Sequence, residues 1–202
     1  DYAEAYNNKG ILLQDKGDVS GAIESYKEAL DINPGYTEAY NNMGSAFTSE
    51  GKLEAALENY KIALEISPEH AETYNNMGVA LKTQGDLEAA LVSFSKAIKI
   101  RPDYAEAYAN MGGTLHDKGD LDPAIASCKE ALKINPDNAE THFNLGLVLL
   151  ESHDYEQAAH HFKLSHFEKS QYYLLRCLYL QDKKSLFYDH LDDLIDQGEI
   201  HP

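Results

Sequence analysis

Small and apolar side chains recur along most of the chain at the spacing of an amphipathic helix. They follow the i, i+3, i+4, i+7 pattern of one buried helix face. Two such stripes follow one another: first Tyr40, Met43, Gly44 and Phe47, then Leu53, Ala56, Leu57, Tyr60, Ala63 and Leu64. Gly51 lies between them, and glycine adopts the positive φ of a helix C-terminus without a steric penalty. Pro68 ends the second stripe. The pattern therefore predicts two helices joined by a tight turn.

This helix pair repeats along the chain with a constant period. Proline recurs every 34 residues, at Pro34, Pro68, Pro102 and Pro136. Other columns in the same register are Gly10, Gly44, Gly78, Gly112 and Gly146, then Ala22, Ala56, Ala90, Ala124 and Ala158, and Tyr6, Tyr40, Tyr74 and Tyr108. Such a period is typical of a solenoid, because one helix pair cannot bury its apolar stripe alone and must stack on its neighbours.

The order of residues within one period resembles the tetratricopeptide repeat. The residues that carry the resemblance in the second period are Tyr40, Met43, Gly44, Phe47, Ala56, Tyr60, Ala63 and Pro68. The resemblance implies an all-α fold, a right-handed α-solenoid in which the first helix of each pair lines a concave face. It covers residues 1–168 as five repeats, with bounds near 1–34, 35–68, 69–102, 103–136 and 137–168.

Beyond residue 168 the period is lost, but helical patterns continue. One apolar stretch runs from Tyr173 to Leu180, and the next runs from Leu186 to Ile195, with Gly198 as a stop. Acidic residues occupy the other face of the second stretch, at Asp189, Asp192, Asp193 and Asp196. Residues 169–202 are therefore predicted to be a pair of capping helices. The chain begins within a repeat and ends at Pro202 without a tail, which predicts a fragment of a longer protein.

Composition narrows the classes of molecule that the protein is expected to bind. The 202 residues include 34 acidic and 17 basic side chains, a formal net charge of −17, which argues against nucleic acid and against anionic membranes. The sequence contains no apolar run of membrane-spanning length, so no membrane partner is expected. Two cysteines are too few for a disulfide scaffold and predict a reducing, cytoplasmic compartment.

One asparagine per repeat falls in the predicted first helix. This column consists of Asn8, Asn42, Asn76, Asn110 and Asn144, and Asn7, Asn41 and Asn75 lie beside it. Asparagine is a poor mid-helix residue, so its recurrence needs a reason. One hypothesis is a ladder of amides that binds the backbone of an extended peptide, similar to the peptide-binding superhelix of O-GlcNAc transferases. The alternative is that asparagine is simply common at this position of the family.

Glutamates line the expected rim of the same groove, at Glu4, Glu38, Glu72, Glu106 and Glu140. The helix macrodipole alone explains an acidic residue in a first turn. With Asp15, Asp117 and Glu151 against a single base, Lys82, the expected groove has a charge of about −7. That sign argues against a carboxylate clamp for acidic tails and favours a neutral or basic ligand.

Near the end of the array the expected groove positions become apolar, at Phe143, Leu147 and Leu150. They are interpreted either as a pocket for an apolar anchor of the ligand or as a contact with the capping helices.

Catalytic and metal-binding motifs do not account for the remaining polar residues. His153, His160, His161 and His166 lie close together without the spacing of a zinc site. No phosphate-binding loop, nucleophile elbow or dinucleotide fingerprint occurs in the sequence. The sequence therefore predicts a protein that is not an enzyme and that needs no metal or cofactor.

The leading functional hypothesis is a protein-interaction scaffold that binds an extended peptide or protein segment in an acidic, asparagine-lined groove. The alternative is the substrate-recognition arm of a larger enzyme, for example a glycosyltransferase, whose catalytic domain is not in this chain. Self-association is a third hypothesis.

Overall fold

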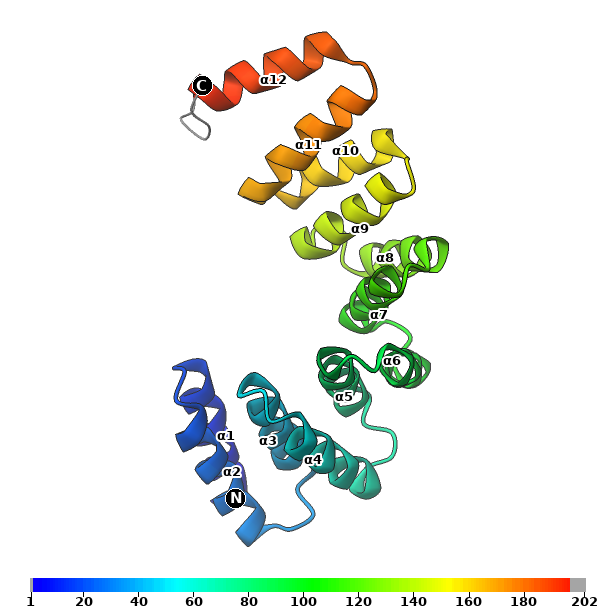
Figure 1. The fold of residues 1–202 in the computed structure, drawn as a ribbon. Coiled ribbons are helices and arrows are strands. Elements are labelled where there is room, and N and C mark those ends of the chain that lie inside the picture. The colour runs from blue at the N-terminus through cyan, green and yellow to red at the C-terminus, as the bar shows by residue number, and fades with distance from the viewer. Residues whose placement is uncertain (1, 197–202) are drawn as a thin grey trace. The chain divides into compact units, whose positions relative to one another are not determined.

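The computed structural model describes residues 2–196, which form twelve α-helices (Figure 1). The helices are α1 (Tyr2–Asp15), α2 (Val19–Ile32), α3 (Thr37–Ser49), α4 (Leu53–Ile66), α5 (Ala71–Gln84), α6 (Leu87–Ile100), α7 (Ala105–Lys118), α8 (Leu121–Ile134), α9 (Ala139–Glu151), α10 (Tyr155–Ser165), α11 (Glu168–Leu180) and α12 (Lys184–Asp196). The predicted all-α solenoid is confirmed. The predicted stop at Gly198 and the chain end at Pro202 lie outside the described residues, as do the side chains of Asp193 and Asp196.

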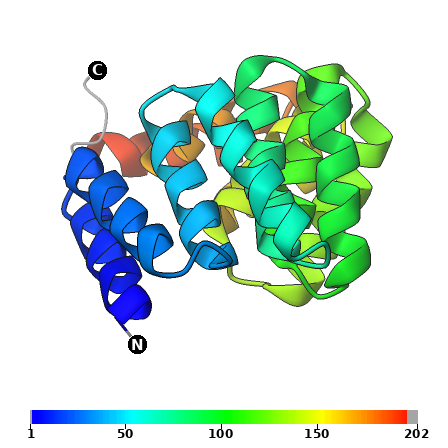
Figure 2. The same cartoon turned by 90° about the horizontal axis from the view of Figure 1, so that it is seen from below.

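The chain forms two compact units, residues 1–114 and residues 115–202, and the boundary falls within α7. In the first unit the pairs α1–α2, α3–α4 and α5–α6 follow one another (Figures 1 and 2). Each second helix touches the first helix of the next pair, α2 against α3 and α4 against α5. The first helices also touch, α1 against α3 and α3 against α5.

Local sequence explains where the helices begin and turn. Asp18 and Asp86 begin α2 and α6, and each carboxylate accepts a hydrogen bond of 3.0 Å from the backbone N–H three residues later. The predicted turn glycines have positive φ, for example 73° at Gly51 and 92° at Gly85. His153 occupies the corresponding position between α9 and α10 with φ 66°.

The small-residue columns allow the two helices of a pair to approach closely. The aromatic ring of Tyr60 on α4 lies against Gly44 of α3, so that a Cβ at Gly44 would be only 2.5 Å from Tyr60 Cε1. Gly78 and Phe94 make the same contact in the next pair, where the corresponding distance is 2.6 Å. The Tyr60 hydroxyl lies 3.2 Å from Thr48 Oγ1, and burial raises the pKa of Tyr60 to about 12. The ring therefore fills the space that the glycine leaves without losing its polar partner.

The second unit has an aromatic core. Phe143, Phe162 and Leu174 are buried in one cluster contributed by α9, α10 and α11. Ser165 and Ser170 are buried where α10 ends and α11 begins, and their hydroxyl oxygens lie 2.6 Å apart. These two serines replace the alanine and proline of the earlier repeats, and their mutual hydrogen bond satisfies both buried hydroxyls. No helix within residues 2–196 combines the length and the apolar character needed to cross a membrane.

Candidate functional site

The asparagine column predicted as a ladder lies on the first helices of successive pairs. Asn8, Asn42, Asn76 and Asn110 belong to α1, α3, α5 and α7 of the first unit. Asn8 is exposed and the other three are half-buried, so each side chain reaches the surface. Asn144, the fifth member, is half-buried on α9 of the second unit. We call these five residues the ladder asparagines.

The neighbouring asparagines Asn7, Asn41 and Asn75 have a different environment. Their exposed fractions are only 4%, 2% and 0%. Asn41 and Asn75, which the sequence grouped with the peptide-binding residues, are therefore closed off from a ligand within the first unit. We call these three residues the inner asparagines.

Each inner asparagine is hydrogen-bonded to a ladder asparagine of the next repeat. Asn42 Nδ2 donates to Asn7 Oδ1 over 3.0 Å, and Asn76 Nδ2 donates to Asn41 Oδ1 over 3.1 Å. The third bond, from Asn110 Nδ2 to Asn75 Oδ1, measures 3.0 Å. These bonds satisfy amide groups that would otherwise be costly to bury. They also hold each of these ladder side chains toward the first helix of the preceding pair.

Glutamates from the predicted rim extend two of these bonds. Asn41 Nδ2 donates to Glu72 Oε1 over 3.3 Å, and Asn75 Nδ2 donates to Glu106 Oε1 over 3.0 Å. The first repeat differs, since no hydrogen bond links Asn7 to Glu38 among the described residues. Sequence reasoning missed these bonds, although the signal was present: asparagines 35 residues apart and an asparagine–glutamate pair 31 residues apart recur in the same register.

Negative charge at this rim acts on the tyrosines beside it. Burial and the carboxylates of Glu106 and Glu72 together raise the pKa of Tyr104 to about 12, against the opposing effects of Arg101 and of a hydrogen bond with Asn75. Burial raises the pKa of Tyr36, and the carboxylates of Glu38 and Glu4 act in the same direction. Lys82, the one expected base, approaches Gly113 of α7 so closely that a Cβ there would be 3.3 Å from its Nζ.

Comparison with known proteins assigns the family. Models of the tetratricopeptide repeat match residues 3–36 and 71–104, and a second TPR repeat model matches residues 44–85 and 112–152. These segments together cover more than half of the chain. The chain belongs to the tetratricopeptide repeat family. No curated protein matches it significantly.

Solved structures of tetratricopeptide repeat type share the fold. PilF of Pseudomonas aeruginosa is 20% identical with a TM-score of 0.85, and the match covers 96% of this chain and 90% of PilF. PilW, a type IV pilus biogenesis factor, is 19% identical with a TM-score of 0.85 over 98% of this chain and 94% of PilW. MamA is 26% identical with a TM-score of 0.67 over 87% of this chain and 96% of MamA.

The column of the inner asparagines changes character after α5. Its next members are Ala109, which has no amide, and Phe143, which is only 6% exposed. The Phe143 ring lies edge-on to Phe167 and Tyr173, with centroid distances of 5.8 and 5.6 Å. Phe143 is thus part of the core against α11, in agreement with the alternative of a contact with the capping helices, and it is not an open anchor pocket. Leu147 and Leu150 are half-buried against the same core.

The helix pair α9–α10 also contains a histidine pair. His142 Nε2 lies 2.8 Å from the Pro136 carbonyl oxygen and therefore donates to it, which leaves Nδ1 to accept from His161 Nδ1 at 2.9 Å. Burial, together with His142, His160 and Lys129, lowers the pKa of His161 to about 4. Among the described residues no group of three or more side chains has the arrangement of a metal site.

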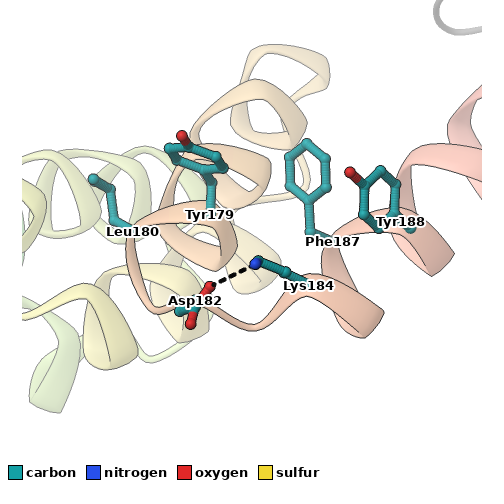
Figure 3. A pocket seen from close by; sticks show the side chains of 6 residues that line it. All are labelled: Tyr179, Leu180, Asp182, Lys184, Phe187 and Tyr188. Carbon is teal, nitrogen blue, oxygen red and sulfur yellow. Dashed lines mark ion pairs between the residues drawn. The ribbon is translucent and has the colours of Figure 1, made fainter.

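A separate cavity of about 480 Å³ lies at the turn between α11 and α12 (Figure 3). The rings of Tyr179, Phe187 and Tyr188 line it, and Asp182 and Lys184 form an exposed ion pair of 3.7 Å at its edge. Tyr179 and Tyr188 have exposed fractions of 72% and 59%. This aromatic surface of the second unit was not singled out in the sequence, because its period-free pattern indicates helices but not their exposed faces.

Proposed function

We propose that this tetratricopeptide repeat protein is an interaction scaffold whose ladder asparagines bind the backbone of an extended, neutral or basic protein segment. A scaffold role in protein interaction is what the family and its structural neighbours support. The observation that carries the finer proposal is the row of surface amides held in place by the inner asparagines. Such positioning lowers the entropy cost of forming hydrogen bonds with a ligand.

Charge supports the same class of ligand. Glu38, Glu72 and Glu106 are exposed beside the ladder, and the chain has a net charge of −17. A basic segment would be attracted to this surface during encounter, whereas an acidic tail would be repelled. A cytoplasmic location is part of the proposal, supported by the two buried cysteines, Cys128 and Cys177, which form no disulfide.

The proposal is tested by replacing Asn42, Asn76 and Asn110 together with alanine. The probe is a fluorescein-labelled peptide of 15 residues built from Lys-Ser-Thr units, and its affinity is measured by fluorescence anisotropy and calorimetry. We expect the triple variant to bind at least about tenfold more weakly, because each lost hydrogen bond contributes roughly 0.5–1.5 kcal/mol.

The matched control is Asn135→Ala, which removes an exposed asparagine at the end of α8. It should leave the affinity unchanged, and circular dichroism should show native helicity in both variants. Absence of binding to the wild-type protein, or equal affinity in the triple variant, contradicts the proposal.

A further inference from the structure

Two of the inner asparagines link a glutamate to a ladder asparagine, and in each link the glutamate determines which atom donates and which accepts. An ionised carboxylate only accepts hydrogen bonds, so Asn75 must turn Nδ2 toward Glu106. Asn75 then turns Oδ1 toward Asn110, which in turn must offer Nδ2. The same reasoning applies to Glu72, Asn41 and Asn76. We call each of these three-residue chains a relay.

Each relay leaves its ladder amide, Asn76 or Asn110, with more free acceptor sites than free donors. A side-chain amide has two N–H groups and an oxygen with two lone pairs, and the relay uses one N–H. Among the described residues Asn110 Oδ1 accepts no hydrogen bond, and Asn76 Oδ1 has only a long contact of 3.5 Å with Asn75 Nδ2. The carbonyl oxygens of Asn76 and Asn110 are therefore suited to a ligand that donates hydrogen bonds.

We propose that Glu72 and Glu106 are positioning residues that, through Asn41 and Asn75, fix the amides of Asn76 and Asn110 with their carbonyl oxygens free to accept, and so select a ligand rich in N–H donors. This inference rests on the proposed function. The ligand class is an extended segment that offers backbone N–H groups together with lysine or arginine side chains, and the exposed glutamates beside the ladder match its charge.

The chain supplies its own control for this idea. Glu4 and Glu38 occupy the same column of first-helix glutamates and are exposed, but neither hydrogen-bonds to an inner asparagine among the described residues. The double variant Glu4→Gln/Glu38→Gln thus removes the same number of charges from the same column as Glu72→Gln/Glu106→Gln. Only Glu72→Gln/Glu106→Gln replaces the carboxylates that determine which atoms of a relay donate and which accept.

Glutamine at positions 72 and 106 either donates or accepts, so each relay can run both ways. If the two directions are equally populated, half of the molecules present each amide correctly, and affinity falls about twofold per relay and about fourfold for both. We therefore expect Glu72→Gln/Glu106→Gln to bind the Lys-Ser-Thr probe about fourfold more weakly than Glu4→Gln/Glu38→Gln does. A probe with alternate backbone nitrogens methylated should bind both variants weakly and equally.

A charge-conserving swap distinguishes direction from simple contact. In Asn75→Asp/Glu106→Gln the new glutamine donates to the new carboxylate, which still accepts from Asn110, so the direction of the relay is restored at unchanged net charge. The swap should recover wild-type affinity, although Asn75→Asp alone lowers the melting temperature by placing two carboxylates against each other. Failure of the swap to bind better than Glu106→Gln contradicts the proposal.

The two proposals fail in different ways. If the triple alanine variant loses binding while Glu72→Gln/Glu106→Gln binds as its control does, the relay is wrong and the ladder proposal stands. If the wild-type protein binds no probe, the relay is judged without ligand from the side-chain amide signals of Asn75 and Asn110 in NMR spectra. One set of signals in the wild type and two sets in Glu106→Gln supports the relay, and one unchanged set in both contradicts it.

Discussion

At the scale of single residues, the close approach of a glycine and an aromatic ring decides how two helices fit together. Gly44 lies against Tyr60, and Gly78 lies against Phe94, with no room for a further carbon atom. Gly113 is also within a helix, but the nearest atom to a new Cβ is the flexible end of Lys82, 3.3 Å away. The same residue type is thus required at two positions and merely tolerated at the third.

This contrast predicts opposite effects of alanine. Gly44→Ala should lower the free energy of unfolding by roughly 1–3 kcal/mol, because the added carbon forces the Tyr60 ring out of place. Gly113→Ala should raise it by roughly 0.5–1 kcal/mol, because alanine favours the helix and Lys82 can move aside. Urea denaturation followed by circular dichroism measures both. A stabilising Gly44→Ala would show that the ring yields without cost.

At the scale of the helical element, the pair α9–α10 differs from the others by its histidines. His142 stands where other repeats have Tyr40, Tyr74 or Tyr108, and His161 stands where they have a small or short polar side chain such as Ser127. The two rings stack with centroids 5.1 Å apart and share one hydrogen bond. Protonation of His161 at Nε2 leaves its Nδ1–H donating to His142 Nδ1, so burial of the ring, and not loss of this hydrogen bond, is the main reason why the neutral form of His161 is favoured.

The lowered pKa of His161, about 4 against 6.5 for an unperturbed histidine, predicts a pH dependence. Between these two values the unfolded chain binds more protons than the folded one, so stability is complete above pH 6.5 and declines as the pH falls toward 4. For a half-buried ring we expect a loss of roughly 1–2 kcal/mol after solvent screening. Thermal unfolding between pH 7 and pH 4 measures it.

The variant His142→Tyr/His161→Ser restores the side chains of the fourth repeat and should flatten this pH profile. His153→Asn is the matched control, since it removes an exposed histidine from a left-handed position that asparagine tolerates. The explanation fails if the control flattens the profile as much as the double variant does.

The sequence and the structure agree wherever the contact lies within one helix pair. The 34-residue period predicted the all-α solenoid, the turn glycines and the first-helix position of the ladder. It did not predict which of Asn41 and Asn42 is buried, because both are asparagines at the edge of the apolar stripe. Contacts with the next repeat decide that, as they decide the burial of Phe143 against α11. Such contacts depend on how repeats stack, which no periodicity within one sequence specifies.

At the scale of the whole molecule, the main electrostatic feature is the excess of acidic side chains. The chain has a net charge of −17, and ion pairs such as Lys133–Glu130 and Lys52–Glu50 join neighbours in sequence at the surface. Exposed pairs of this kind contribute little to stability. Repulsion among the excess carboxylates therefore opposes the folded state of both units.

Salt should accordingly stabilise the protein. Raising NaCl from 0.01 M to 0.15 M shortens the Debye length from about 30 Å to about 8 Å and should raise the melting temperature. A variant with glutamine at four exposed second-helix positions, Glu24, Glu28, Glu58 and Glu65, should start at a higher melting temperature and respond less to salt. Differential scanning calorimetry measures both. A melting temperature that falls with salt would show that attractive pairs outweigh repulsion.

The sequence spacing of the relay residues also bears on how a repeat array can lengthen by duplication. One kind of bond joins asparagines 35 residues apart, which is one residue more than the 34-residue repeat. The other joins an asparagine to a glutamate 31 residues further on, which is three residues fewer than the repeat. A duplicated block of 34 residues copied from the second or third repeat therefore arrives with both halves of each bond already in place. Duplication can lengthen the array without a new interface having to evolve, up to the repeat in which Ala109 occupies the inner column.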